Sequence, residues 1–181
     1  MKKIILFLLL INSFKISLVN YNVEYQEIKK TKFKYDETVL ISCKSNFDID
    51  TCRQIKEFLD KYSKVENKIM ISIYIVESKF NQYANSYLGA KYGRGIGQVS
   101  EIALDEYNRK NKTNYKYNDL YDLEINIMIS CWLIDYYCNT YNFTIEESVM
   151  AYNIGCGNVL NGKKAERYLM LVKNEYRKMM D

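Results

Sequence analysis

The chain of 181 residues contains no histidine and no proline, and it has only seven glycines and one tryptophan. The absence of histidine excludes Ser–His and Cys–His catalysis and every zinc site that needs imidazole ligands. Any acid–base chemistry therefore has to rely on Asp, Glu, Lys, Tyr or Cys side chains. The absence of proline means that helix ends must be marked by capping side chains and by glycine.

The chain also has little excess charge. Its formal net charge is +4, and Lys2, Lys3 and Lys15 lie within the first twenty residues, where there is no acidic residue. The remainder is close to neutral, so a nucleic-acid partner is not expected. A composition of 48% hydrophobic and 27% charged residues is typical of one globular domain that buries a substantial core.

At the N-terminus, charged and apolar residues follow one another in the order typical of an export signal. Lys2 and Lys3 precede an unbroken apolar run over residues 4–11, which is typical of a signal peptide or signal anchor within residues 1–20. The run is too short to span a bilayer as a helix, and the alternative is a buried element at the start of the domain. We expect an exported protein in the periplasm, at the cell surface or secreted, with membrane contact only if the signal stays uncleaved.

Five cysteines in an exported chain suggest disulfides. Cys43 and Cys52 are the candidate pair, which would close a short loop. Cys131 and Cys138 are seven residues apart in one predicted helix, about 10 Å along its axis, beyond the separation of about 7 Å that a disulfide allows. The odd count leaves at least one thiol free or intermolecular, and five buried free thiols remain the alternative.

The hydrophobic pattern predicts a mainly α fold with at most a small β element. Predicted N-caps are Asp50 for a helix ending at about Tyr62, Ser100 for a helix through Tyr107, and Asp122 for a long helix over residues 123–141. A final helix over residues 164–180 would bury Tyr168, Leu171, Val172 and Tyr176. Alternation over residues 38–42 allows one short strand.

The apolar segment over residues 69–77 is ambiguous. Its isoleucines alternate, which slightly favours a strand. The same segment places Ile69, Ile73, Val76 and Phe80 on one helical stripe. From the pattern alone, a strand is slightly favoured.

Four motifs in order resolve this ambiguity. Glu77-Ser78-Lys79-Phe80-Asn81 is followed by Ser86, then by Gly95-Ile96-Gly97-Gln98, by Asp122-Leu123-Glu124-Ile125-Asn126, and by Ala151-Tyr152-Asn153-Ile154-Gly155. Each motif alone is weak, but this order and spacing resemble the soluble lytic transglycosylase (SLT) family, which is related to goose-type lysozyme. The resemblance covers residues 66–172.

The resemblance implies a lysozyme-like, mainly α fold with a helix before Glu77. It implies a catalytic domain over residues 66–181, and residues 21–65 then form an extension with a helix that packs on it. Glu77 would be the catalytic acid and base. Substrate contacts would come from Ser86, Gly95, Gln98, Tyr152 and Asn153, with Gly95 and Gly97 allowing close backbone approach to the substrate.

The chain departs from the family pattern at four places. Gly97 stands where the family usually has Met, Leu123 replaces the usual Pro, and Lys164 stands where an acidic residue is common. About three extra residues lie between Ser86 and Gln98. None of these changes removes Glu77.

The chemistry can be argued from one carboxylate. Cleavage of a glycosidic bond needs a proton for the leaving oxygen, and an apolar cleft keeps a carboxylic acid protonated. Most glycosidases use two carboxylates, but Glu101, Asp105 and Glu106 are expected on a solvated helix face and Asp122 and Glu124 at a helix start. In the SLT family one acid suffices, because the C6 hydroxyl of the N-acetylmuramic acid attacks C1 and leaves a 1,6-anhydro end.

The expected function is therefore a peptidoglycan lytic transglycosylase that cuts the MurNAc–GlcNAc β-1,4 bond without a metal or cofactor. Its partner would be the glycan strand, and protein partners are not indicated. The alternatives are a hydrolytic muramidase on the same fold and an inactive cell-wall-binding protein.

Overall fold

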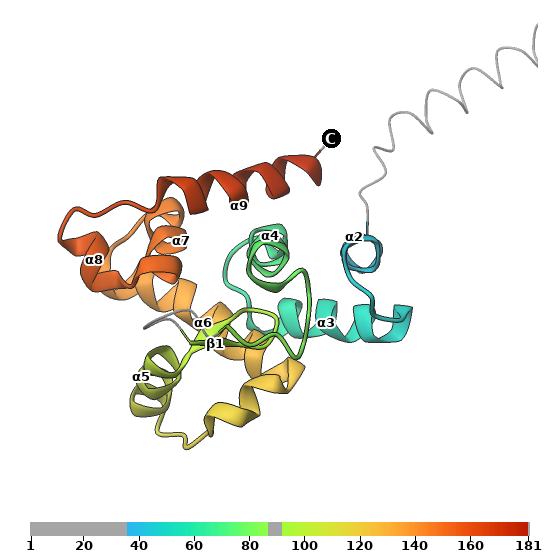
Figure 1. The fold of residues 1–181 in the computed structure, drawn as a ribbon, viewed down its shortest axis with the longest axis horizontal. Helices are drawn as coiled ribbons and strands as arrows, with labels where there is room; N and C mark the ends of the chain where they lie inside the picture. The colour runs from blue at the N-terminus through green and yellow to red at the C-terminus, as the bar shows by residue number, and fades with distance from the viewer. Residues whose placement is uncertain (1–35, 87–91, 181) are drawn as a thin grey trace, which may run out of the picture. The chain divides into compact units, whose positions relative to one another are not determined.

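The computed structural model describes residues 36–86 and 92–180, and these are mainly helical (Figure 1). The predicted export signal and the first part of the predicted extension lie outside the described residues. Among those described, no helix combines the length and apolarity needed to cross a bilayer. In chain order the elements are α2 (Glu37–Lys44), α3 (Ile49–Tyr62), α4 (Asn67–Ser78), β1 (Gly93–Arg94), β2 (Val99–Ser100), α5 (Glu101–Asn111), the 3-10 helix η1 (Tyr117–Tyr121), α6 (Leu123–Tyr141), α7 (Ile145–Ile154), α8 (Cys156–Leu160) and α9 (Glu166–Lys178).

Side-chain caps start most of the helices, as expected for a chain without proline. The predicted caps Ser100 and Asp122 are confirmed: they accept hydrogen bonds from the backbone N–H groups of Ala103 at 3.2 Å and Ile125 at 3.0 Å. The cap of α3 is Asp48, which accepts from Thr51 N at 2.8 Å. The prediction of Asp50 was wrong, because Asp50 lies in the first turn.

The ambiguous segment is a helix, α4, as the family resemblance implies. It lies in the middle of the bundle, between α9 and α3 (Figure 1). Every side chain from Met70 to Tyr74 is buried, so no solvent-facing side interrupts the apolar run. A fully buried helix loses the polar stripe by which a helix is recognised, and this is why the isoleucine alternation pointed to a strand.

Two further expectations were wrong. Residues 38–42 lie in α2 rather than in a strand, with Thr38, Leu40 and Ile41 buried and Asp36 capping the helix. In α9, Tyr168 and Val172 are buried, but Leu171 is 43% exposed.

The predicted Cys43–Cys52 disulfide is not formed, and all five cysteines are free. Cys43 is exposed on α2, whereas Cys52 is buried at the start of α3. The Cys52 thiol lies 3.7 Å from the Ser45 hydroxyl and 3.8 Å from the Phe47 carbonyl oxygen. Cys52 therefore acts as a small core side chain.

The long helix α6 divides the core into two hydrophobic clusters. Ile127, Cys131 and Ile134 of α6 belong to a cluster built around α4, α3 and α9. Ile129, Leu133 and Tyr137 belong to a second cluster with the β-hairpin and α5. Tyr152 of α7 packs against both clusters. The residues of the candidate site lie where the two clusters meet.

Candidate active site

Glu77 lies in the last turn of α4, where the helix is stopped sharply. Lys79 and Phe80 both have positive φ, 54° and 60°, which is unusual for residues other than glycine. Phe80 is 2% exposed and packs edge-on against Tyr74, with ring centroids 5.9 Å apart. Burial of the Phe80 ring holds the turn in place, and Glu77 is left half-buried at the end of a rigid helix.

The carboxylate of Glu77 accepts a hydrogen bond from Tyr168 of α9. The Tyr168 hydroxyl lies 2.5 Å from Glu77 Oε1. Burial, together with the negative charge of Glu77, raises the pKa of Tyr168 well above its ordinary value. Tyr168 therefore stays protonated as a donor, and it fixes one of the two carboxylate oxygens of Glu77.

The hairpin that carries Gln98 is held by the amide of Asn126 on α6. Asn126 is 1% exposed; its Nδ2 donates to the carbonyl oxygens of Arg94 and Leu120, both at 2.8 Å. Its Oδ1 accepts from Gly97 N at 2.8 Å. This buried amide satisfies three backbone groups of chain segments that are far apart in sequence.

Two hydroxyl groups attach the same hairpin to the walls of the site. Ser78 Oγ, beside Glu77, donates to the carbonyl oxygen of Ile96 at 2.8 Å. The Tyr152 hydroxyl donates to the carbonyl oxygen of Gly97 at 2.6 Å. The end of α4, the hairpin and α7 thus form one hydrogen-bonded unit. The Tyr152 hydroxyl is already used, so the ring of Tyr152 is left for a ligand.

The glycines of the hairpin allow close packing inside the protein. A Cβ at Gly95, where φ is +72°, would lie 2.2 Å from Asn126 Nδ2 and 2.3 Å from the Leu120 carbonyl oxygen. A Cβ at Gly97 would lie 2.9 Å from the Tyr152 hydroxyl. Gly95, expected to contact the substrate, does not line the cavity. The missing Cβ of Gly95 therefore leaves room for Asn126, and that of Gly97 leaves room for Asn126 and Tyr152.

Ser86 and Gln98 are oriented by backbone groups of the same region. Gln98 Nε2 donates to the carbonyl oxygens of Ala84 at 3.1 Å and Gly95 at 2.9 Å. Ser86 Oγ accepts from Gly93 N at 2.9 Å. Neither side chain extends freely into solvent.

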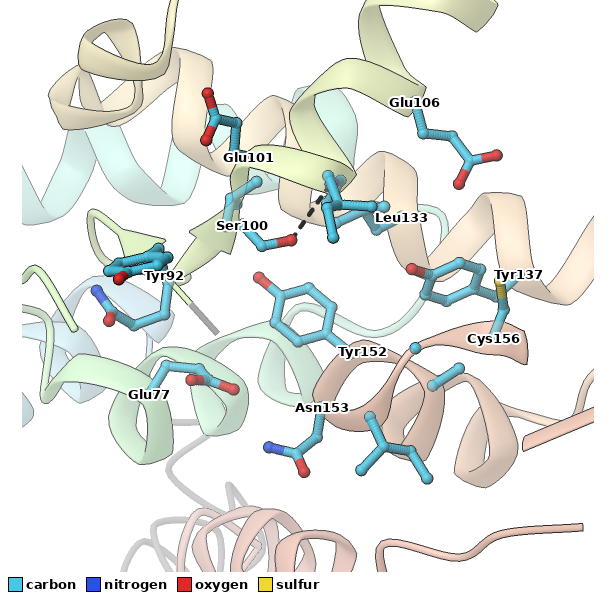
Figure 2. Close-up of a pocket in the computed structure, with 18 of the residues that line it drawn as sticks. Glu77, Tyr92, Ser100, Glu101, Glu106, Leu133, Tyr137, Tyr152, Asn153 and Cys156 are labelled. Atoms are coloured by element: carbon cyan, nitrogen blue, oxygen red, sulfur yellow. Dashed lines mark hydrogen bonds between the residues drawn. The ribbon is translucent and has the colours of Figure 1, made fainter. Parts of the chain in front are cut away.

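These residues surround one cavity of about 760 Å³, within the range of small-molecule sites. The predicted residues that line it are Glu77, Ser86, Gln98, Tyr152 and Asn153. Figure 2 shows Glu77 near one end and the ring of Tyr152 in the middle. Burial and the nearby charge of Glu77 raise the pKa of Tyr152 well above its ordinary value, so this ring stays neutral.

Sequence reasoning missed several side chains of the cavity. Glu101 and Glu106 of α5 lie across it from Glu77 (Figure 2). Glu101 is exposed, as expected for a solvated face, but neither residue was expected to line a cavity. Glu106 is half-buried and accepts hydrogen bonds from Arg109 and from the Tyr136 hydroxyl at 3.1 Å. Tyr137 and Cys156 line the opposite end. The signal that was available is the cap Ser100, which begins α5 directly after the hairpin of Gln98.

No metal site is evident in residues 36–86 and 92–180, where no three His, Cys, Asp or Glu side chains are grouped so as to hold an ion.

A family model described as the transglycosylase SLT domain matches residues 55–170. The match covers more than half of the chain, and the protein belongs to this family, whose members act on peptidoglycan. The predicted family and the mainly α, lysozyme-like fold class are thereby confirmed. The matched region begins inside α3. No curated protein matches the chain.

Proposed function

We propose that the protein is a lytic transglycosylase that cuts the β-1,4 bond between N-acetylmuramic acid and N-acetylglucosamine and leaves 1,6-anhydromuramic ends. Glu77 acts first as the acid and then as the base. The observation that carries this proposal is the half-buried Glu77 carboxylate, which lines the cavity while Tyr168 holds one of its oxygens.

The proton balance needs a single carboxylic acid. Glu77 gives its proton to the bridging oxygen as the C1–O bond breaks, and the N-acetylglucosamine part leaves with a hydroxyl group. The resulting Glu77 carboxylate takes the proton of the C6 hydroxyl of the same muramic acid, and O6 bonds to C1. No water is consumed, and the acid is regenerated for the next turnover.

The surrounding groups suit this cycle. The Tyr168 hydroxyl stabilises the carboxylate that exists between the two proton transfers, because a hydrogen bond to an ionised acceptor is stronger than one to a neutral acceptor. Asn153 and Gln98 supply fixed amide dipoles beside the reacting sugar, and Ser86 adds a hydroxyl to the wall. Tyr152 offers the face of its ring.

Hydrolysis is the second candidate, and the two carboxylates of α5 favour it. Glu101 and Glu106 line the same cavity, and a carboxylate across the sugar from the acid is the arrangement that activates a water molecule in inverting glycosidases. The product then has a reducing end rather than an anhydro end. A protein that only binds the wall is the third candidate, which the retention of Glu77 disfavours.

The test is mass analysis of purified peptidoglycan after digestion. The proposal expects soluble fragments with 1,6-anhydromuramic ends, which are lighter by one water than reducing ends. Exclusively reducing ends would establish the hydrolytic candidate instead, and an undigested wall would favour the binding protein.

The substrate is also consistent with export, because peptidoglycan lies outside the cytoplasm. We expect residues 1–20 to direct this export, with residues 21–65 as an extension of the catalytic domain. The Lys2–Lys3 pair and the apolar run behind it support the first expectation.

A further inference from the structure

The cavity continues past Tyr152 to an end that the proposed reaction does not use. This end is lined by Leu133 and Tyr137 of α6, Ala151 of α7 and Cys156 of α8. Figure 2 shows Tyr137 and Cys156 separated from Glu77 by the ring of Tyr152. A glycan that reaches from Glu77 to this end therefore places a sugar there other than the one whose C1 reacts.

Tyr137 stands out among the buried tyrosines of the site. It is 6% exposed, and its hydroxyl points toward the middle of the cavity (Figure 2). It makes no hydrogen bond with any residue that the structure describes, whereas the hydroxyls of Tyr152 and Tyr168 bond to Gly97 and Glu77. Among the described residues, the buried side-chain polar atoms without a partner are Arg94 Nε and Tyr117 Oη. The Tyr137 hydroxyl is not one of them, so it is reached from the cavity and is open to a ligand.

The Tyr137 hydroxyl can only be a neutral group at physiological pH. Burial, with the nearby Cys156 and Glu106, raises the pKa of Tyr137 far above its ordinary value. It therefore offers an O–H donor beside the nearly buried Leu133, at 3% exposure, and Ala151, at 0%, with the Glu106 carboxylate nearby.

One donor beside apolar walls fits one group of the glycan best. A sugar hydroxyl is both donor and acceptor and needs no apolar contact, whereas an acetamido group combines a strong carbonyl acceptor with a methyl group that gains from burial. Both sugars of peptidoglycan carry this group. We propose that the Tyr137 hydroxyl donates a hydrogen bond to the acetamido oxygen of a sugar bound at this end, with Leu133 against its methyl group. This contact rests on the proposed function, which makes peptidoglycan the substrate.

The experiment measures binding, so that it does not depend on cleavage. Tyr137→Phe removes only the hydroxyl. The matched control is Tyr107→Phe: Tyr107 is 7% exposed, belongs to the same hydrophobic cluster, makes no hydrogen bond through its hydroxyl within the described residues, and does not line the cavity. The two ligands, measured by calorimetry, are tetra-N-acetylchitotetraose and its fully de-N-acetylated tetramer.

Tyr137→Phe should weaken binding of the acetylated tetramer about two- to tenfold, as expected for one net hydrogen bond. It should not change binding of the de-N-acetylated tetramer or the melting temperature. Tyr107→Phe should leave the binding of both tetramers and the melting temperature unchanged. An equal loss for both tetramers, no loss for either, or no binding of the acetylated tetramer to the wild type would overturn the inference. A wild type that binds this tetramer but leaves peptidoglycan uncut would overturn the proposed function and not the acetamido contact.

Discussion

Tyr168 gives the sharpest quantitative test of the geometry at Glu77. The Tyr168→Phe variant deletes the hydroxyl 2.5 Å from Glu77 Oε1 and keeps the ring, which is 9% exposed. Before proton transfer the bond reaches a neutral acid, and afterwards it reaches a carboxylate. Net hydrogen bonds are worth about 0.5–1.5 kcal/mol to neutral groups and about 1.5–3 kcal/mol to charged groups.

The hydrogen bond from Tyr168 is therefore stronger by about 1–1.5 kcal/mol once Glu77 has given up its proton. Losing this added stabilisation corresponds to about a tenfold fall in kcat. Substrate binding should change little, since Tyr168 is directed at Glu77. Because a donor to a carboxylate favours the charged form, its loss should also move the alkaline limb of the pH–rate profile to higher pH. A role limited to packing would not move that limb.

The assay is the release of soluble fragments from purified peptidoglycan across a range of pH, with melting temperature as a check of folding. Tyr176→Phe is the matched control, because Tyr176 lies on the same helix and its hydroxyl donates to Glu66 at 2.7 Å on the surface. If Tyr168→Phe keeps the wild-type kcat and pH profile, the reasoning about Glu77 is refuted.

Three other outcomes are expected. Asn126→Ala should lower the free energy of unfolding by about 3 kcal/mol or more in a urea titration, because the hydrogen bonds to Arg94, Gly97 and Leu120 are lost, the last two of them buried. A change below about 1 kcal/mol would contradict the role given to this amide. Burial raises the pKa values of Tyr74, Tyr152 and Tyr168 above the ordinary 10.0. The stability that these neutral hydroxyls contribute is complete below pH 10 and should be lost as the pH rises from there through the pKa values of the folded state. A free energy of unfolding that stays flat over that range would be inconsistent with this expectation. Cell fractionation should place the protein outside the cytoplasm, and a mainly cytoplasmic pool that retains Met1 would exclude export.

The sequence was most informative where side-chain types are distinctive and least informative where a whole segment is buried. Glu77, Gln98 and Asn153 were identified from the order of short motifs, and all three line the cavity. The helix α4 was ambiguous because periodicity reports a boundary between core and solvent, and Met70 to Tyr74 have no solvent side. The strand expected over residues 38–42 was wrong for another reason: an alternation of five residues is too short to tell a strand from a helix, and in α2 Val39 is exposed while Thr38, Leu40 and Ile41 are buried.

Other features depend on tertiary contacts that no local pattern encodes. The close approach at Gly95 and Gly97 is to Asn126 and Tyr152, which lie in other helices. Tyr137 is one of eighteen tyrosines, so only the packing of α6 against α7, which places it on the cavity wall, distinguishes it. The position of Glu106 on the cavity wall likewise follows from the docking of α5 and not from its charge.

The central claim is that one carboxylate both gives and takes the proton. Its most direct test is the digestion of peptidoglycan by Glu77→Gln, which keeps the size of the side chain and removes both proton transfers. Loss of acid–base help typically costs about 10²–10⁴-fold, and the loss here should reach the upper part of that range, while Glu57→Gln, an exposed change on α3, should cut like the wild type. Release of anhydro fragments by Glu77→Gln at the wild-type rate would contradict the account.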